Sequence, residues 1–230
     1  MPRYFASVTA IFWGGNNMNS EEVLKFWFEE IEPSQHWKKD QEFDQLVRDR
    51  FAKVHLAARR CELFGRRTSA EGRLAEIIVL DQFSRNMFRG QPDSFSSDPL
   101  ALALAQEGIS VGADQQLTDQ HAAFLYMPFM HSESAMIHEV ALEVFAKTNN
   151  VDFKLKHKAI IDRFGRYPHR NEILNRKSTE EEIEFMKGPN STFSEVNVIR
   201  AFYRCSCQMV SDSLMLRSQS TDIYSPSSQT

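Results

Sequence analysis

The sequence predicts an all-α fold, and three observations support that prediction. Apolar residues recur at the spacing i, i+3, i+4 along most of the chain, the period of a helix with one buried face. Capping residues such as Asn, Asp, Ser and Thr precede these stretches, and Gly or Pro follows them. No stretch shows the clear alternation of apolar and polar residues that is typical of a strand. Because the connections are short, we expect about eight helices in antiparallel hairpins.

The first two helices are predicted between residues 19 and 65. Asn19 is a good N-cap with Glu22 as its capping-box partner, and Pro33 ends this helix. The second helix is expected from Asp40 to about Phe64, and Gly65 follows it as the terminating residue. Its inward stripe consists of Phe43, Val47, Phe51, Val54 and Ala58.

The third helix is expected from Leu74 to Gly90. A fourth begins at Asp98, an N-cap that Pro99 follows in the first turn, and ends at Gly108. The remaining predicted helices are a segment that Thr118 caps and Pro128 kinks or breaks, Ser132 to Lys147, Asp152 to Phe164, and a short helix from a Ser178–Glu181 capping box to about Lys187.

The two ends of the chain differ in composition from the part between them. Met18 is a second candidate start, so residues 1–17 are expected to be an extension that is disordered or lies upstream of the true start. Residues 18–193 are expected to form a single α-helical domain. The tail, residues 194–230, is expected to be weakly helical at first and then disordered, because Ser, Gln, Asp and Thr dominate its last part.

The composition narrows the class of protein. A net charge of −4 gives no indication of nucleic-acid binding, and no apolar run reaches the roughly 20 residues that a membrane helix needs. The three cysteines are too few for a disulfide framework, so we expect a soluble protein of the reducing cytoplasm. Cys205 and Cys207 have no partner ligands nearby, which makes a zinc site there a weak reading.

Ionisable residues occupy places on three apolar stripes. On the third helix the stripe Leu74, Ile77, Ile78 continues to Asp81 and Arg85, which are four residues apart and therefore able to pair. Burying a charge is costly unless it is paired. The core side of this helix is thus predicted to hold either a structural ion pair or a binding site.

Glu133 and His157 repeat this pattern on two other helices. Glu133 extends the stripe Met136, Ile137, Val140, Ala141 and Val144, and His157 shares a face with Phe153, Ile160, Ile161 and Phe164. Taken singly, each of these polar residues is more often a satisfied part of the core than a reactive group. Together they indicate one functional pocket, in which we expect Asp81, Glu133 and His157 to converge.

The candidate residues point to a small anionic ligand. Planar forks that bind carboxylate or phosphate are offered by Arg85, Arg163, Arg166 and Arg170. The alternative is that Arg85 and Arg163 only pair with Asp81 and Glu133, which would leave no net positive charge. Catalytic candidates are Asp81, Glu133, His157 and His169. Expected ligand-binding residues are Gln82, Arg85, Asn86, His131, Arg163, Arg166, Arg170 and Asn171.

Established cofactor and metal motifs are missing from the sequence. There is no phosphate-binding loop, no GxGxxG, no GxSxG and no HExxH. His131, Glu133, His157 and His169 have ligand chemistry, but their spacing is not that of a helical metal site. We therefore expect neither a metal nor a cofactor.

Five motifs follow one another along the chain, namely FWF (26–28), LDQFSRNMFRG (80–90), FLYMPFMHSE (124–133), RFGRYPHRN (163–171) and STEEEIEFM (178–186). With them, residues 18–193 resemble the bacterial family called domain of unknown function 924. The resemblance implies a tetratricopeptide-like helical fold and no particular activity. Its motif positions coincide with the polar candidates above. The sequence departs at its two ends and at Ser84, where relatives are expected to carry proline.

Three functions remain open from the sequence. The leading one is a helical domain whose polar pocket binds a small anionic ligand. The second is a hydrolase-type enzyme that uses the same pocket, with Glu133 or Asp81 as general base and His157 or His169 as acid. The third is a protein-interaction module, since helical repeats often bind protein partners. Neither enzymatic activity nor the oligomeric state follows from the sequence, and no nucleic-acid or membrane partner is expected.

Overall fold

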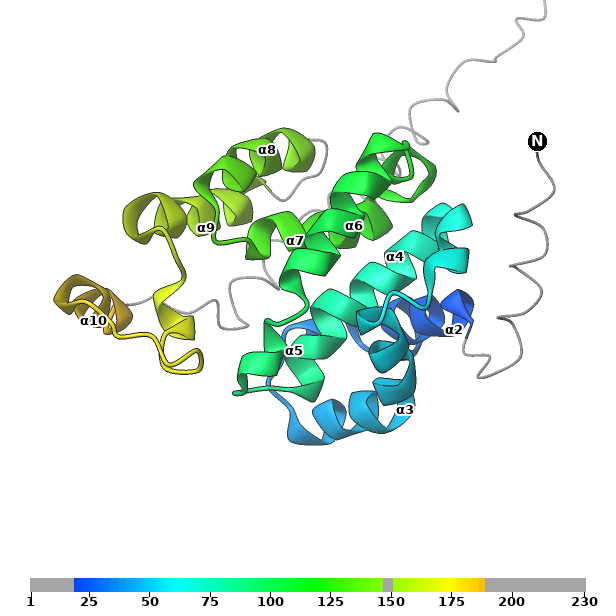
Figure 1. Ribbon diagram of the computed structural model, residues 1–230, viewed down its shortest axis with the longest axis horizontal. Coiled ribbons are helices and arrows are strands. Elements are labelled where there is room, and N and C mark those ends of the chain that lie inside the picture. Colours follow the sequence, from blue (N-terminus) through cyan, green and yellow to red (C-terminus); the bar gives the residue numbers. More distant parts are fainter. Residues whose placement is uncertain (1–18, 147–150, 189–230) are drawn as a thin grey trace, which may run out of the picture.

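The computed structural model describes residues 19–146 and 151–188, and its regular structure consists of helices (Figure 1). The α-helices are α2 (Ser20–Lys25), α3 (Gln41–Arg59), α4 (Ala70–Ile78), α5 (Ser84–Met87), α6 (Asp98–Ser110), α7 (Asp119–His131), α8 (Ala135–Phe145), α9 (Val151–Phe164) and α10 (Glu180–Met186). Within the described ranges there is no strand, so the predicted all-α class is confirmed.

Short 3-10 and π-helical turns join or extend these helices. Two of them are π-helical, η1 (Phe26–Glu30) and η4 (Val79–Phe83). The 3-10 turns are η2 (Pro33–His36), η3 (Phe64–Thr68), η5 (Pro92–Ser94), η6 (Asp114–Gln116) and η7 (Pro168–Arg170). The expected extension 1–17 and the tail 194–230 lie outside the described residues, so the predicted single domain stays a proposal.

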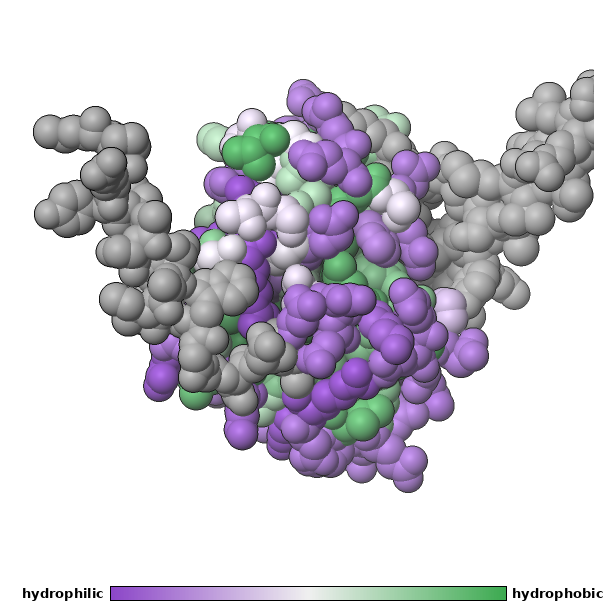
Figure 2. Space-filling view, turned by 90° about the vertical axis from the view of Figure 1, so that its right-hand side faces the viewer, coloured by the Kyte–Doolittle hydropathy of each residue, from purple (hydrophilic) through white to green (hydrophobic). Residues whose placement is uncertain are grey.

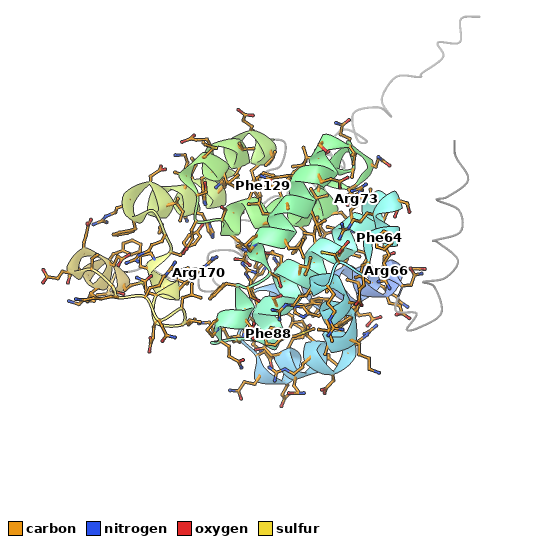
Figure 3. The ribbon with its side chains drawn as sticks, viewed as in Figure 1. Phe64, Arg66, Arg73, Phe88, Phe129 and Arg170 are labelled. Carbon is orange, nitrogen blue, oxygen red and sulfur yellow. The ribbon has the colours of Figure 1, made fainter. Side chains whose placement is uncertain are left out.

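The main core forms where the first helices pack around the helix that runs from α4 through η4 into α5. Helix α2 packs on α4, α3 packs on η4 and α5, and α4 also contacts α6 and α7. The predicted inward stripe of α3 is confirmed, since Phe43, Val47, Phe51, Val54 and Ala58 are all buried. Phe88 and Phe129 lie among these helices (Figure 3).

Helices α6 to α9 continue the chain by packing in succession, α6 on α7, α7 on α8 and α8 on α9. Thr118 caps α7 as predicted, because its side chain accepts a hydrogen bond from the His121 N–H. Pro128 does not break this helix, which runs on to His131. Every residue of α7 from 122 to 130 is buried, and this packing compensates for the backbone hydrogen bond that the proline removes.

A smaller cluster forms around α9, η7 and α10. Ile160, Ile161 and Tyr167 are its buried members, and Phe164 and Phe185 pack against them. Helix α10 lies at the opposite end of the molecule from α2 (Figure 1). The second cluster is separate from the main core, and it is joined to that core by the packing of α9 on α8 and by the hydrogen bond from the Tyr167 hydroxyl to the Met130 carbonyl.

Several helix ends differ from the predictions. Helix α3 stops at Arg59, because Cys61 adopts a left-handed φ of 58° and the chain turns before Gly65. The capping box of α10 is formed by Thr179 and Glu182, one residue later than expected.

The predicted inward face of α8 is wrong in two positions. Met136 is 76% exposed and Val140 is 40% exposed, whereas His138 is buried. The helix begins at Ala135 after the N-cap Ser134, and it turns His138, Ala141 and Phe145 toward its neighbours α7 and α9. Glu133 therefore precedes the helix and belongs to the turn between α7 and α8.

The surface drawn in Figure 2 is mostly hydrophilic, with hydrophobic residues in separate small areas. None of the described helices is long and apolar enough to span a membrane.

Candidate functional site

The helix that carries the motif LDQFSRN contains a wider turn at its centre. Residues Val79–Phe83 form the π-helical turn η4, and all five of them are buried. Such turns inside α-helices are rare and are often found at functional sites. The periodicity of the sequence predicts a regular helix here, so the turn was not foreseen.

Asp81 lies in this turn with a fully buried side chain. Its Oδ1 accepts a hydrogen bond of 2.7 Å from His131 Nδ1 and lies 3.1 Å from Arg85 Nη1, which confirms the predicted pairing with Arg85. Burial alone raises the pKa of this carboxyl, but the charge of Arg85 and the contacts with His131 and Gln82 bring the pKa down to about 2. Asp81 is therefore ionised at neutral pH.

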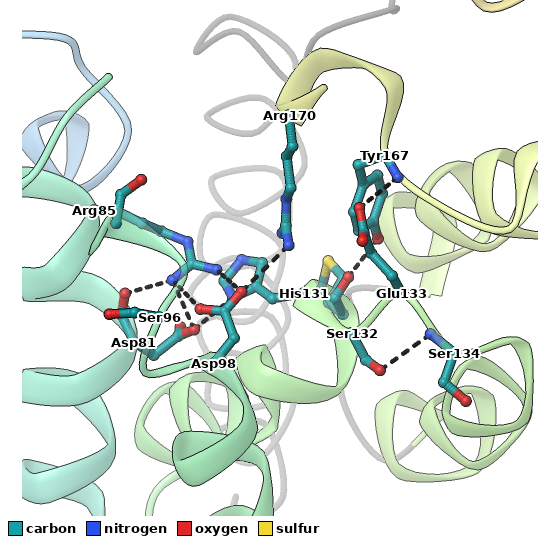
Figure 4. A network of polar contacts seen from close by, with 12 residues as sticks. Asp81, Arg85, Ser96, Asp98, His131, Ser132, Glu133, Ser134, Tyr167 and Arg170 are labelled. Atoms are coloured by element: carbon teal, nitrogen blue, oxygen red, sulfur yellow. Dashed lines mark hydrogen bonds and ion pairs between the residues drawn. The ribbon is translucent and has the colours of Figure 1, made fainter. Parts of the chain in front are cut away.

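A second carboxylate joins the Asp81–Arg85 pair to the C-terminal part of the protein (Figure 4). Asp98 Oδ2 accepts a hydrogen bond of 3.0 Å from Arg85 Nη2, and it lies 3.3 Å from Arg170 Nη1. Arg170 also lies over the rings of Phe95 and Tyr167, at 4.5 and 4.7 Å from their centroids. Asp98 thus binds two arginines instead of capping α6, for which no side-chain capping bond is present.

His131 ends helix α7 and faces Asp81 from there. Burial and the charge of Arg85 lower the pKa of His131, and together they outweigh the opposing effect of Asp81. The imidazole is therefore neutral at pH 7. Since an ionised carboxylate only accepts hydrogen bonds, the proton of His131 resides on Nδ1 and the lone pair on Nε2.

A pocket opens beside His131, with a cavity volume of about 160 Å³. It brings together five of the predicted residues, four from the turns around η4 and the end of α7 and one, His157, from α9. The side chains that line it are His36, Trp37, Lys38, Gln82, Arg85, Asn86, Arg89, Met127, His131 and His157.

Glu133 points to the C-terminal segment and not into this pocket. Its Oε1 accepts a hydrogen bond of 2.8 Å from the Tyr167 N–H, and its two oxygens bind Arg176 at 2.6 and 2.9 Å. Burial raises the pKa of Glu133, but the Arg176 and Tyr167 hydrogen bonds hold the pKa below its ordinary value. This geometry suits a structural anchor and makes Glu133 a poor general base.

The remaining candidates lie outside the pocket lining. Arg163 is exposed and pairs with Glu181, while Arg166 binds Glu182. Asn171 donates hydrogen bonds to Ser178 and Glu182. His169 packs near Tyr167, with ring centroids 5.4 Å apart, and burial together with the charge of Arg170 lowers its pKa to about 3. Arg170 reaches from η7 toward the main body and joins the Asp98 network (Figure 3).

Several residues at the site were not predicted from the sequence. Arg89 binds the buried Asp44 through Nε and Nη2, the latter at 2.7 Å. His36 and Lys38 come from the turn after α2, where the sequence shows only a helix end. The sole signal for Arg89 was its place in the motif MFRG, and for Arg176 there was none.

The described residues offer no arrangement of three or more His, Cys, Asp or Glu side chains that is placed to hold a metal ion. The four residues considered for a metal are divided among different contacts. His131 binds Asp81, and Glu133 binds Arg176.

The residues of this site all lie within the part of the chain that matches a known protein family. Residues 23–190 match the family described as bacterial protein of unknown function, domain of unknown function 924. A solved structure of a protein of unknown function from Agrobacterium tumefaciens, ATU0120, is 37% identical and has a TM-score of 0.70, over 74% of this chain and 97% of that one. No curated protein matches the chain. The chain therefore belongs to the bacterial family called domain of unknown function 924.

Proposed function

We propose that the pocket beside His131 binds a small anionic molecule. The observation that carries this proposal is the lining itself: it includes the cations Lys38, Arg85 and Arg89, and no Asp or Glu is among the described residues that line it. The carboxylates that balance the two arginines lie behind them, since Asp81 and Asp44 are both buried. An anion in the pocket would meet donors first.

The two arginines are held in place before any ligand arrives. Arg85 is fixed by Asp81 and Asp98, and Arg89 is fixed by Asp44. A guanidinium has five N–H donors, and Arg89 uses Nε and Nη2 to bind Asp44. No hydrogen bond among the described residues uses its Nη1 donors, so these can bind a ligand. Binding a carboxylate or phosphate with a preorganised fork costs less conformational entropy than binding it with a free side chain.

The volume of the pocket limits the size of the ligand. A cavity of about 150 Å³ holds a benzene molecule, so the volume of about 160 Å³ here suits a short carboxylic acid or a simple phosphate compound. Nucleotides and most cofactors are too large to fit entirely within it. Trp37 and Met127 add an apolar wall, which favours a ligand with a short apolar part next to its anionic group.

The test is a thermal-shift titration of the full chain with butyrate, succinate and inorganic phosphate, against sodium chloride at equal ionic strength. A ligand that binds only the native state raises the melting temperature. We expect at least one anion to do so, and we expect Lys38→Gln and Arg89→Gln to weaken the response.

Lys53→Gln is the matched control, because Lys53 is an exposed lysine of α3 outside the pocket lining. It removes the same charge from the protein and is expected to leave the response unchanged. Equal responses in the wild type and in the two pocket variants, or no response beyond that to chloride, would contradict the proposal.

A further inference from the structure

We infer that His131 is the general base of a hydrolytic reaction in this pocket, with Asp81 as its positioning residue. This inference rests on the proposed anion site and adds a reaction to it. It replaces the expectation that Asp81 or Glu133 is the base, because Asp81 is fully buried behind His131 and Glu133 is bound to Arg176.

The orientation of the imidazole is the first argument. The hydrogen bond of 2.7 Å from Nδ1 to Asp81 leaves Nε2 as the atom on the other side of the ring. Nε2 has no hydrogen-bond partner among the described residues, and the His131 side chain, 14% exposed, lines the pocket. A buried carboxylate that fixes the tautomer of a histidine is the arrangement by which hydrolases direct a basic nitrogen at the reacting group.

The protonation state is the second argument. Burial and the charge of Arg85 lower the pKa of His131, so the imidazole is free to accept a proton at neutral pH. Asp81 stays ionised and stabilises the imidazolium that forms during the reaction. A histidine that is neutral at the working pH has the basic nitrogen that a general base requires.

The nucleophile in this scheme is water, since no Ser, Thr or Cys is among the described residues that line the pocket. His131 Nε2 takes one proton from the water while its oxygen forms a bond with the acyl carbon of a small anionic ester or anhydride. The bond from that carbon to the leaving oxygen then breaks, and the leaving oxygen receives the proton back from Nε2. One water is consumed, and a carboxylic acid and an alcohol or phosphate are released.

Arg85 is placed to stabilise the negative charge that develops in this step. Its guanidinium lines the pocket and is fixed by Asp81 and Asp98. Fixed donors aimed at a developing oxyanion are often the largest single contribution to such catalysis. The same side chain therefore serves both anion binding and the reaction.

The experiment measures the hydrolysis of acetyl phosphate and of monomethyl succinate by the full chain, two small anionic acyl compounds that suit the pocket. His131→Asn keeps an N–H donor for Asp81 and removes the basic nitrogen. We expect turnover by the wild type, and a fall in kcat by about 10²- to 10⁴-fold in His131→Asn. Inorganic phosphate should still raise the melting temperature of this variant, because Lys38, Arg85 and Arg89 remain in the lining.

The pH profile tests the role of Asp81. The wild-type rate should fall as the pH drops through the pKa of His131, below its ordinary value of 6.5. Because the Asp81 carboxylate raises that pKa, Asp81→Asn should move the midpoint to lower pH, in addition to reducing kcat. A purely structural role of Asp81 would leave the midpoint where it was.

The outcomes separate this inference from the proposed function. If anions raise the melting temperature but neither compound is hydrolysed above the rate in buffer, the inference is overturned and the binding site stands. If His131→Asn hydrolyses as fast as the wild type, the inference is also overturned. If there is neither binding nor hydrolysis, the proposed function fails with it.

Discussion

Asp81 and His131 are 50 positions apart in the chain, yet their Oδ1 and Nδ1 atoms lie 2.7 Å apart. This hydrogen bond joins the π-helical turn η4 to the end of helix α7. It fixes the tautomer of His131 and supplies one of the partners that a buried carboxylate requires. The stability of the fold and the proposed chemistry of the pocket thus depend on the same contact.

Arg85→Ala should strongly destabilise the protein. Arg85 neutralises Asp81, which is fully buried, and Asp98, whose side chain is 14% exposed. Removing one partner of a buried ion pair leaves an uncompensated charge and typically costs about 3 to 5 kcal/mol. Urea unfolding at pH 7 measures this loss.

Arg163→Ala is the matched control for that substitution. Arg163 also pairs with a carboxylate, Glu181, but both side chains are more than half exposed. Exposed pairs contribute up to about 1 kcal/mol. A loss of less than about 1 kcal/mol for Arg85→Ala, close to that of the control, would mean that water reaches the Asp81 pair.

Glu133 is predicted to hold the C-terminal segment on the main body through Arg176. The double-mutant cycle of Glu133→Gln and Arg176→Gln should give a coupling energy of at least about 0.5 kcal/mol, as expected for residues in one network. The cycle of Glu133→Gln and His157→Ala should give a smaller value, because Glu133 contacts Arg176 directly. Additive losses for Glu133 and Arg176 would show that the ion pair is not a stabilising link.

Lys154 should make the stability depend on pH above neutrality. It is fully buried next to His138, and burial together with the charge of Lys158 lowers its pKa from 10.5 to about 7. Between pH 7 and pH 10.5 the unfolded chain binds this proton and the native protein does not. The free energy of unfolding should therefore rise with pH, by up to about 1.4 kcal/mol per pH unit from this group.

The measurement compares urea unfolding at pH 7, 8 and 9 for the wild type, Lys154→Met and Lys53→Met. Lys154→Met should show a flatter dependence on pH, since it lacks the group whose pKa changes. The exposed Lys53→Met should retain the slope of the wild type. Equal slopes for all three proteins would mean that Lys154 remains charged in the native state.

A chain shortened to residues 18–193 should unfold at the same temperature as the full chain. The helical pattern of the sequence is continuous within these limits, and the family match at residues 23–190 lies inside them. Thermal denaturation of both chains decides the question. A clear fall in the midpoint would show that residues outside this range contribute to the stability of the domain.

Local sequence patterns were sufficient to predict much of the fold. The predictions that were confirmed depend on residues within about four positions of one another. They are the stripe of α3, the caps Asn19 and Thr118, and the pairing of Asp81 with Arg85. At this range the geometry of the helix alone brings side chains together, so the spacing of residues in the sequence is enough to predict which of them are in contact.

The tertiary structure decided which polar residues meet. His131 reaches Asp81, and Asp98 binds both Arg85 and Arg170, only because separate helices pack side by side. The same packing turned His138 of α8 inward and left Met136 exposed, against the predicted stripe. A helix with apolar residues on more than one side does not specify which face is buried, because that choice depends on the neighbours it packs against.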